Sequence, residues 1–171
     1  LALARVAGGE PLEPLLESAL AAADALEDLL ARSFERTDVA MDRAAHLVFL
    51  ARGPSLASAR QAALMFHEVA LRGAAAMSAA AFRHGPLEMA GPGLHAVVLQ
   101  PYGPTAALVE NLAAEIAGFG AQVTRIADAR LGRGEFRHAP VAEELAPLVN
   151  IAPVQVLAYR EALTLGREPG T

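Results

Sequence analysis

The segment HLVFLARGPS, residues 46–55, decides the fold class of this chain. Its first six residues, apolar except for His46, have the length of a buried strand, and the Gly-Pro pair after Arg52 turns the chain. A helical pattern follows at residues 56–72, with Ser55 at the position of its N-cap. The segment therefore predicts a strand–turn–helix unit, the repeating element of α/β folds.

The same alternation continues along the chain. The further predicted elements are strands at residues 75–78, 95–100, 121–127 and 136–139, a helix at residues 104–118 and a closing helical block at residues 141–165. We expect Pro147 or Pro153 to interrupt the last block. The pattern indicates an α/β class: a doubly wound, Rossmann-like, mostly parallel sheet flanked by helices in three αβα layers. Ligands of such folds bind at the carboxyl ends of the strands.

An amphipathic helix precedes this unit. Apolar residues, Phe34 among them, recur at steps of three and four between residues 11 and 36. We predict that this helix packs on the rest of the chain, and we assign residues 1–40 to a helical connector and residues 41–171 to the ligand-binding domain. Residues 1–6 resemble the end of an earlier helix, so we expect the chain to be a fragment of a longer protein.

The composition of the 171 residues excludes several classes of function. There are 19 acidic residues against 14 basic ones, so the chain lacks the basic excess of a nucleic-acid binder. All the basic residues are arginine, and without lysine no Schiff base can form. The absence of cysteine excludes disulfides and thiolate chemistry and favours the cytoplasm. No apolar run reaches the ~20 residues that a membrane span needs, and we predict no signal peptide.

Three turns fall at the predicted carboxyl ends of strands, at residues 52–55, 101–105 and 128–134. A phosphate site normally combines glycine turns with several hydroxyls at a helix N-terminus. Here the hydroxyls are few, and prolines remove amides that would bind oxygen. Weak candidates for substrate binding are Arg52, Ser55 and Thr105, and the two hydroxyl residues are favoured as helix-start residues instead. We predict no complete phosphate site in this chain.

The helix at residues 56–72 carries the first catalytic candidate. Four of its residues, at spacings of four, three and four, share one face: Gln61, Met65, Glu68 and Arg72. Glu68 lies among apolar neighbours and is a candidate general base, with Gln61 and Met65 as weak candidates for substrate contact. The alternative is that Glu68 is a solvated surface acid or the partner of Arg72.

His84 has a different setting, between Arg83 and the Gly-Pro pair of a loop. A histidine held in a tight turn can transfer protons near neutral pH, so His84 is a second catalytic candidate. The pair His67-Glu68 lacks the second histidine that a zinc-binding helix carries four residues after the first. The other histidines show no ligand spacing, and we predict neither a metal nor a cofactor.

These residues resemble a known family. The segment FRHGPL at residues 82–87 and the Arg-Gly turn after the first strand are similar to motifs of the sugar isomerase (SIS) family, above all the second SIS domain in the isomerase half of glucosamine-6-phosphate synthases. In that family a catalytic glutamate lies sixteen residues before a catalytic histidine, and Glu68 and His84 reproduce this interval. Residues 141–147 and 153–159 resemble the family's closing helices.

The resemblance implies a function and partners. It implies that His84 assists opening of the ring of a hexose 6-phosphate and that Glu68 carries a proton between C1 and C2 of the open chain. In the family the histidine reaches the site of the neighbouring subunit, so a homodimer is implied. An upstream SIS domain, whose Ser/Thr-rich loops hold the phosphate of the sugar phosphate, is implied as well.

Departures from the family leave the reaction open. The family has an acid at Gln61, a lysine at Met65 and an acid at Ala81, and its tail lysine lies beyond the last residue of this chain. An isomerase or deaminase of an amino sugar phosphate therefore fits as well as amino transfer to fructose 6-phosphate. The alternative from another class is a non-catalytic module that senses phosphosugars. The presence of both Glu68 and His84 favours the enzyme.

Overall fold

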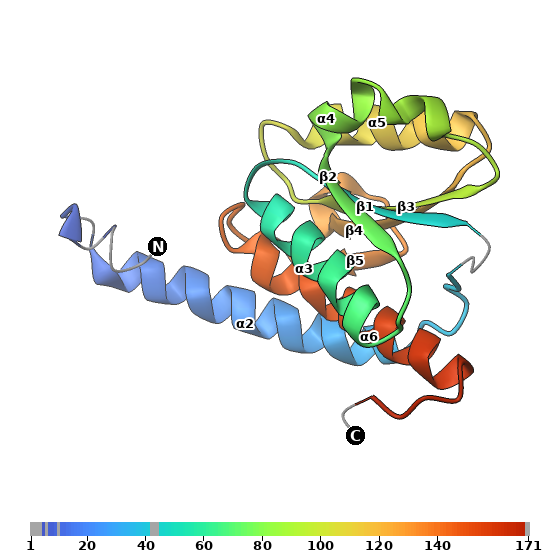
Figure 1. The fold of residues 1–171 in the computed structure, drawn as a ribbon. Helices are drawn as coiled ribbons and strands as arrows, with labels where there is room; N and C mark the ends of the chain where they lie inside the picture. Colours follow the sequence, from blue (N-terminus) through green and yellow to red (C-terminus); the bar gives the residue numbers. More distant parts are fainter. Residues whose placement is uncertain (1–4, 6, 10, 42–44, 170–171) are drawn as a thin grey trace.

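A computed structural model describes residues 5, 7–9, 11–41 and 45–169. Five parallel strands form one sheet in the order β2-β1-β3-β4-β5 (Figure 1). The strands are β1 (His46–Ala51), β2 (Ala74–Ser78), β3 (Leu94–Gln100), β4 (Gln122–Asp128) and β5 (Phe136–His138). The helices are α2 (Leu12–Glu35), α3 (Leu56–Glu68), α4 (Ala79–Arg83), α5 (Ala106–Gly118) and α6 (Ala146–Thr164), with 3₁₀ turns η1 (Gly53–Ser55), η2 (Pro86–Met89) and η3 (Ala129–Leu131).

Helices cover both faces of the sheet (Figure 1). α2, α3 and α6 share one apolar cluster with one face, and α4 and α5 share a second cluster with the other. This three-layer αβα arrangement confirms the predicted α/β class. The face on which each helix lies determines the direction in which the chain leaves the preceding strand. These directions decide where a ligand site can form.

Strand β1 shows why the quoted segment decides the fold. Its side chains alternate between the two clusters: Leu47 and Phe49 enter the cluster with α3 and α6, while Val48 and Leu50 enter the other. Because both faces of a parallel sheet are covered, such a strand is apolar at every position instead of alternating with polar residues. The Phe49 ring packs 5.3 Å from the ring of Phe66 in α3, which joins the strand to the helix that follows it.

The predicted boundaries hold better for strands than for helices. The strand at 46–51 is confirmed without a shift, and the other four lie within one residue of their predicted ranges. The closing helix is shorter than predicted, because α6 begins at Ala146 with Pro147 in its first turn; the break predicted at Pro153 is wrong, since α6 runs through that residue without interruption. A proline inside a helix costs about 3 kcal/mol. Here it lies in a buried stretch of α6, and the burial of its neighbours Val154 and Leu157 offsets that cost.

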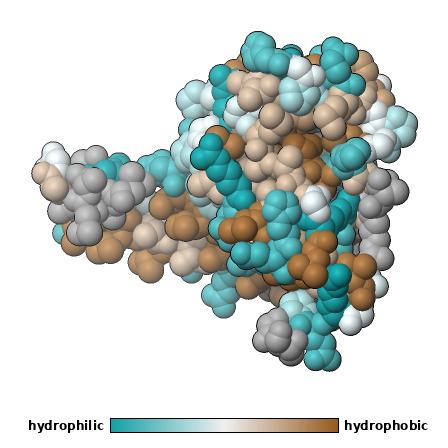
Figure 2. All heavy atoms as spheres, in the orientation of Figure 1, coloured by the Kyte–Doolittle hydropathy of each residue, from teal (hydrophilic) through white to brown (hydrophobic). Residues whose placement is uncertain are grey.

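The amphipathic helix predicted near the start is confirmed as α2, but only part of its apolar face is buried. Ala25 and Leu29 are buried against the body of the domain, whereas the first half of α2 projects beyond it (Figure 1). On that half Leu16 and Leu20 are 52% and 66% exposed, and Figure 2 shows hydrophobic side chains gathered there. Phe34 is exposed as well. Most of the predicted helix end at residues 1–6 lies outside the described residues.

Candidate functional site

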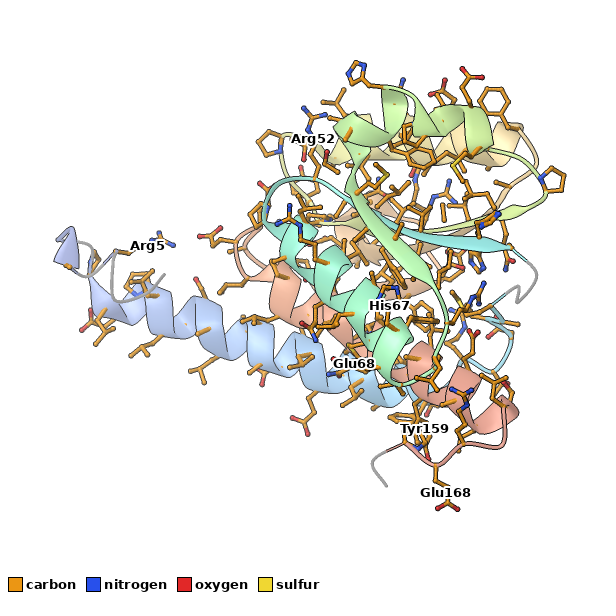
Figure 3. The ribbon with its side chains drawn as sticks, in the orientation of Figure 1. Arg5, Arg52, His67, Glu68, Tyr159 and Glu168 are labelled. Atoms are coloured by element: carbon orange, nitrogen blue, oxygen red, sulfur yellow. The ribbon has the colours of Figure 1, made fainter. Side chains whose placement is uncertain are left out.

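The sheet has one topological switch point, between β1 and β3. The chain leaves β1 for α3 on one face and leaves β3 for α5 on the other. In doubly wound folds the ligand binds in the crevice outside the carboxyl ends of the strands at such a point. The predicted turns after β1 and β3 meet at this edge. Arg52 is half buried in the first of them, and Figure 3 labels it beside the turn that follows β1.

The hydroxyl residues near the switch point directly precede α3 and α5, as predicted, but they do not cap these helices. Neither Ser55 nor Thr105 makes a capping hydrogen bond from its side chain. An N-cap side chain needs an extended backbone to reach the first free amides, but Ser55 has φ −65° and ψ −9° because the 3₁₀ turn η1 already precedes α3. Ser55 Oγ is fully buried and accepts a hydrogen bond of 3.3 Å from Asn150 Nδ2 in α6. Its hydroxyl is therefore directed away from the crevice.

An arginine that the sequence did not single out lies at the same edge. The carboxylate of Asp128, buried at the end of β4, accepts hydrogen bonds from Arg130 Nε at 2.9 Å and Nη2 at 2.7 Å. The guanidinium lies 4.2 Å from the ring centroid of Tyr102 and also donates to the carbonyl of Val141. Burial alone would raise the pKa of Asp128, but the hydrogen bonds from Arg130 outweigh it and lower that pKa. The signal of this ion pair in the sequence is the acidic residue Asp128, which directly follows the strand predicted at residues 121–127.

Buried His138 gives a pH dependence of stability. Its Nδ1 bonds to the carbonyl of Ala139 at 2.7 Å, and no described residue pairs with Nε2. Burial lowers the pKa of His138 below the ordinary 6.5. The positive charges of Arg130 and Arg32 lower this pKa further, whereas the negative charge of Asp128 raises it. A protonated ring would place an unpaired charge in the interior, so the unfolded chain binds this proton at a higher pH than the folded chain does.

We therefore expect the free energy of unfolding to fall as the pH decreases from about 7 to about 5. Urea unfolding of the chain across this range measures the slope. In His138→Gln the slope is expected to be shallower, because the titrating ring is absent. A slope unchanged in His138→Gln would contradict the prediction.

Glu68 lies on the opposite side of the sheet from the switch point, near the amino ends of the strands. α3 returns along the sheet from the carboxyl end of β1, so its last residue reaches the amino ends of the strands, where Figure 3 shows Glu68. The side chains of Glu68 and Gln61 are exposed, and Met65 between them is half buried. The expected stripe stops at Glu68, because the helix ends there and Leu71 takes a left-handed φ of 47°. Arg72 is thereby directed to Glu161 in α6 and not to Glu68.

His84 lies beyond the opposite end of β2. It follows α4, its side chain is exposed, and Gly85 behind it has a φ of 136° that glycine adopts readily. Strand β2 runs between Glu68 and His84, and its five residues span roughly 13 Å. Within one chain the two candidates therefore lie beyond opposite ends of strand β2 and do not meet.

The remaining site predictions concern metals. Exposed His67 contacts the backbone of Ala74 in the edge strand β2, with its Nε2 2.9 Å from the carbonyl oxygen and 3.0 Å from the amide nitrogen. Within residues 5, 7–9, 11–41 and 45–169, no group of three or more acidic, histidine or cysteine side chains could hold a metal ion.

None of the helices in those ranges is long and apolar enough to cross a membrane.

The parallel sheet and its switch point define a doubly wound α/β domain. The chain belongs to the SIS domain family, whose model matches residues 41–164. Among similar proteins are glutamine–fructose-6-phosphate aminotransferases (isomerizing): that of Pyrococcus horikoshii is 29% identical over 92% of this chain, and that of Caulobacter vibrioides is 30% identical over 90%. The chain spans about a quarter of the length of these curated relatives, 26% and 25%.

Solved structures confirm the fold. Glucosamine-6-phosphate deaminase from Thermotoga maritima superposes with a TM-score of 0.75 over 98% of this chain and 49% of its own, at 23% identity. The C-terminal domain of glucosamine-fructose-6-phosphate aminotransferase from Francisella tularensis gives a TM-score of 0.70 over 94% of this chain and 45% of its own, at 21% identity. Both matched structures are about twice as long as this chain.

Proposed function

We propose that this chain is the phosphosugar-binding domain of a cytoplasmic enzyme that moves a proton between C1 and C2 of a hexose or hexosamine 6-phosphate. Glu68 is the base that carries the proton, and His84 assists opening of the sugar ring. The observation that carries the proposal is the sixteen-residue interval between Glu68 and His84, which resembles the interval between the catalytic glutamate and histidine of SIS enzymes. The similarity to isomerizing aminotransferases supports it at the level of the family.

The placement of the two residues supports a site shared between subunits. Glu68 and His84 are both exposed and lie beyond opposite ends of strand β2, so a site that uses both takes one of them from a second copy of the domain. We therefore propose a homodimer in which His84 completes the site of its neighbour. An upstream SIS domain fits the exposed apolar stripe of Leu12, Leu16 and Leu20 on α2. Its loops would hold the phosphate group.

The type of reaction depends on the face that carries Glu68. Gln61 and Met65 offer neither the acid nor the lysine that the synthases have there, so the arrangement suits an isomerase or deaminase as well as an aminotransferase. Proton NMR of the intact protein in D2O, with fructose 6-phosphate, glucose 6-phosphate and glucosamine 6-phosphate offered separately, tests the proposal. Deuterium entering at C1 or C2 of one sugar is expected. No exchange with any of the three would contradict an isomerase-type enzyme.

His84→Asn is expected to slow the reaction of the closed-ring sugar phosphate by about 10²-fold, because a proton donor for ring opening is lost. The loss with an open-chain substrate is expected to be smaller, since that substrate needs no ring opening. Rates of both substrates with the variant and the unaltered protein measure the difference. Equal losses on the two would remove His84 from ring opening.

A non-catalytic phosphosugar sensor is the second candidate. Uncharged Met65 at the position of the family's lysine favours it, because a sensor needs to bind the sugar but not to transfer its protons. The same NMR experiment separates the two functions: binding without deuterium exchange would support the sensor.

A further inference from the structure

Two glycines lie at the topological switch point, one on each of the turns that follow β1 and β3. Gly53 follows β1 with a φ of 60°, and Gly103 lies in the turn after β3. Without side chains these residues leave room outside the carboxyl ends of β1 and β3, where the ligand of a doubly wound fold binds. What fills this room therefore decides what the domain can bind.

The carboxylate of Glu143 fills it. Glu143 belongs to the connection between β5 and α6, 40 residues beyond Gly103 in the sequence. A Cβ built on Gly103 would lie 2.5 Å from Glu143 Oε2, and one built on Gly53 would lie 3.3 Å from Oε1. One carboxylate group thus lies beside both turns, at the position where an anionic ligand is held in related folds.

No partner neutralises this carboxylate in the part of the chain that the structure describes. Glu143 is half buried, yet none of the described residues donates a hydrogen bond to it or forms an ion pair with it. Its neighbour Glu144 is exposed and pairs with Arg5 at 2.8 Å. Of the two adjacent acids, only Glu143 reaches the crevice.

The groups that usually attract phosphate are directed elsewhere. Ser58 Oγ donates to the carbonyl of Pro147 at 2.7 Å, and buried Ser55 bonds Asn150, so both hydroxyls near the β1 turn are bound to α6. Two arginines remain at this edge. Arg52 forms no hydrogen bond or ion pair with the described residues, whereas Arg130, which is paired with Asp128, stacks on Tyr102 one position before Gly103. Positive charge thus borders a crevice that a negative side chain occupies.

We propose that Glu143 acts as an internal anion that occupies the switch point and excludes phosphate groups from it. The inference rests on the proposed function in taking a phosphate monoester as the relevant anion. It adds that the phosphate of the sugar is held outside the β1 and β3 turns of this domain. It also assigns to Glu143 a role in specificity, since the side chain competes with the ligand both by its volume and by its charge.

Replacing Glu143 by Ala is expected to open the crevice to anions. Inorganic phosphate titrated into the ¹⁵N-labelled 171-residue chain at low ionic strength gives the affinity, and the amides of Gly53 and Gly103 report the place of binding. We expect Glu143→Ala to bind phosphate about tenfold or more tightly than the unaltered chain, with these two amides shifting most. Like charges ~5 Å apart near a protein surface repel by more than the 1.4 kcal/mol that makes a factor of ten.

Two further variants make the experiment decisive. Glu144→Ala removes the same charge one residue away and is expected to leave phosphate binding unchanged, which separates the crevice from the net charge of −5. Glu143→Gln keeps the volume and is expected to gain less than Glu143→Ala. If neither Glu143 variant gains affinity, or if Glu144→Ala gains as much, the inference is wrong. Binding to this chain is read without turnover, so the result is independent of the deuterium-exchange test of the proposed function.

Discussion

Glu68→Gln is expected to lower the rate of deuterium exchange at C1 and C2 of the sugar phosphate by about 10²-fold to 10⁴-fold, the range that a positioned general base contributes. The amide keeps the size and polarity of the side chain but cannot accept the proton. Because Glu68 is exposed at the end of α3, the change is expected to alter the free energy of unfolding by less than about 0.5 kcal/mol. NMR exchange rates and urea unfolding on the same protein samples measure the two effects.

A matched control separates the base from a general effect of charge. Glu27→Gln makes the same change at an exposed position of α2 and is expected to leave the exchange rate unaltered. Exchange at the unaltered rate in Glu68→Gln would remove this residue from the mechanism. A loss of equal size in both variants would point to the net charge of the protein instead.

Arg72→Met is expected to have the largest effect on stability, about 3–5 kcal/mol. Arg72 Nη1 lies 3.0 Å from both carboxylate oxygens of Glu161, and Nη2 donates to the carbonyl of Ala45 at 2.9 Å. The two charged side chains are only 11% and 5% exposed. Methionine keeps the apolar stem of the arginine but leaves the largely buried Glu161 carboxylate without its cation.

Urea unfolding measures this loss, and two comparisons test its cause. Arg133→Met breaks an ion pair to Glu110 in which the arginine is 56% exposed, and its cost is expected to be below about 1 kcal/mol. Replacing both members of the buried pair, Arg72→Met with Glu161→Leu, is expected to recover much of the stability, because no buried charge is then left unpaired. An Arg72→Met variant as stable as Arg133→Met would contradict the prediction.

The local sequence pattern predicted the structure reliably where a strand is buried on both faces, because its consecutive residues are then apolar. The apolar run of β1 predicted a central strand of a parallel sheet, and the structure places its residues alternately in two cores. The helices were less well predicted at their ends. α3 stops at Glu68, four residues before the predicted end, since the chain has to turn there to enter the edge strand β2.

The candidate site was harder to predict because its parts come from distant segments. The interval between Glu68 and His84 can be counted in the sequence. It does not predict that strand β2 separates the two side chains, one beyond each of its ends. Ser55 and Thr105 stand at the predicted helix starts, yet neither side chain makes a capping hydrogen bond. Their neighbours in space, such as Asn150, are as far as 95 residues away.

The sequence by itself determined the fold class, the alternation of strands and helices, the family resemblance and the exclusion of lysine and cysteine chemistry, because each depends on residue types or on short-range periodicity. Only the tertiary structure decided that Arg72 pairs with Glu161, that the hydroxyls of the first turn face α6, and that Glu143 fills the crevice between Gly53 and Gly103. These contacts join residues 40 to 95 positions apart. Packing of the helical layers on the sheet brings these residues together, and no pattern within a short stretch of sequence predicts contacts over such separations.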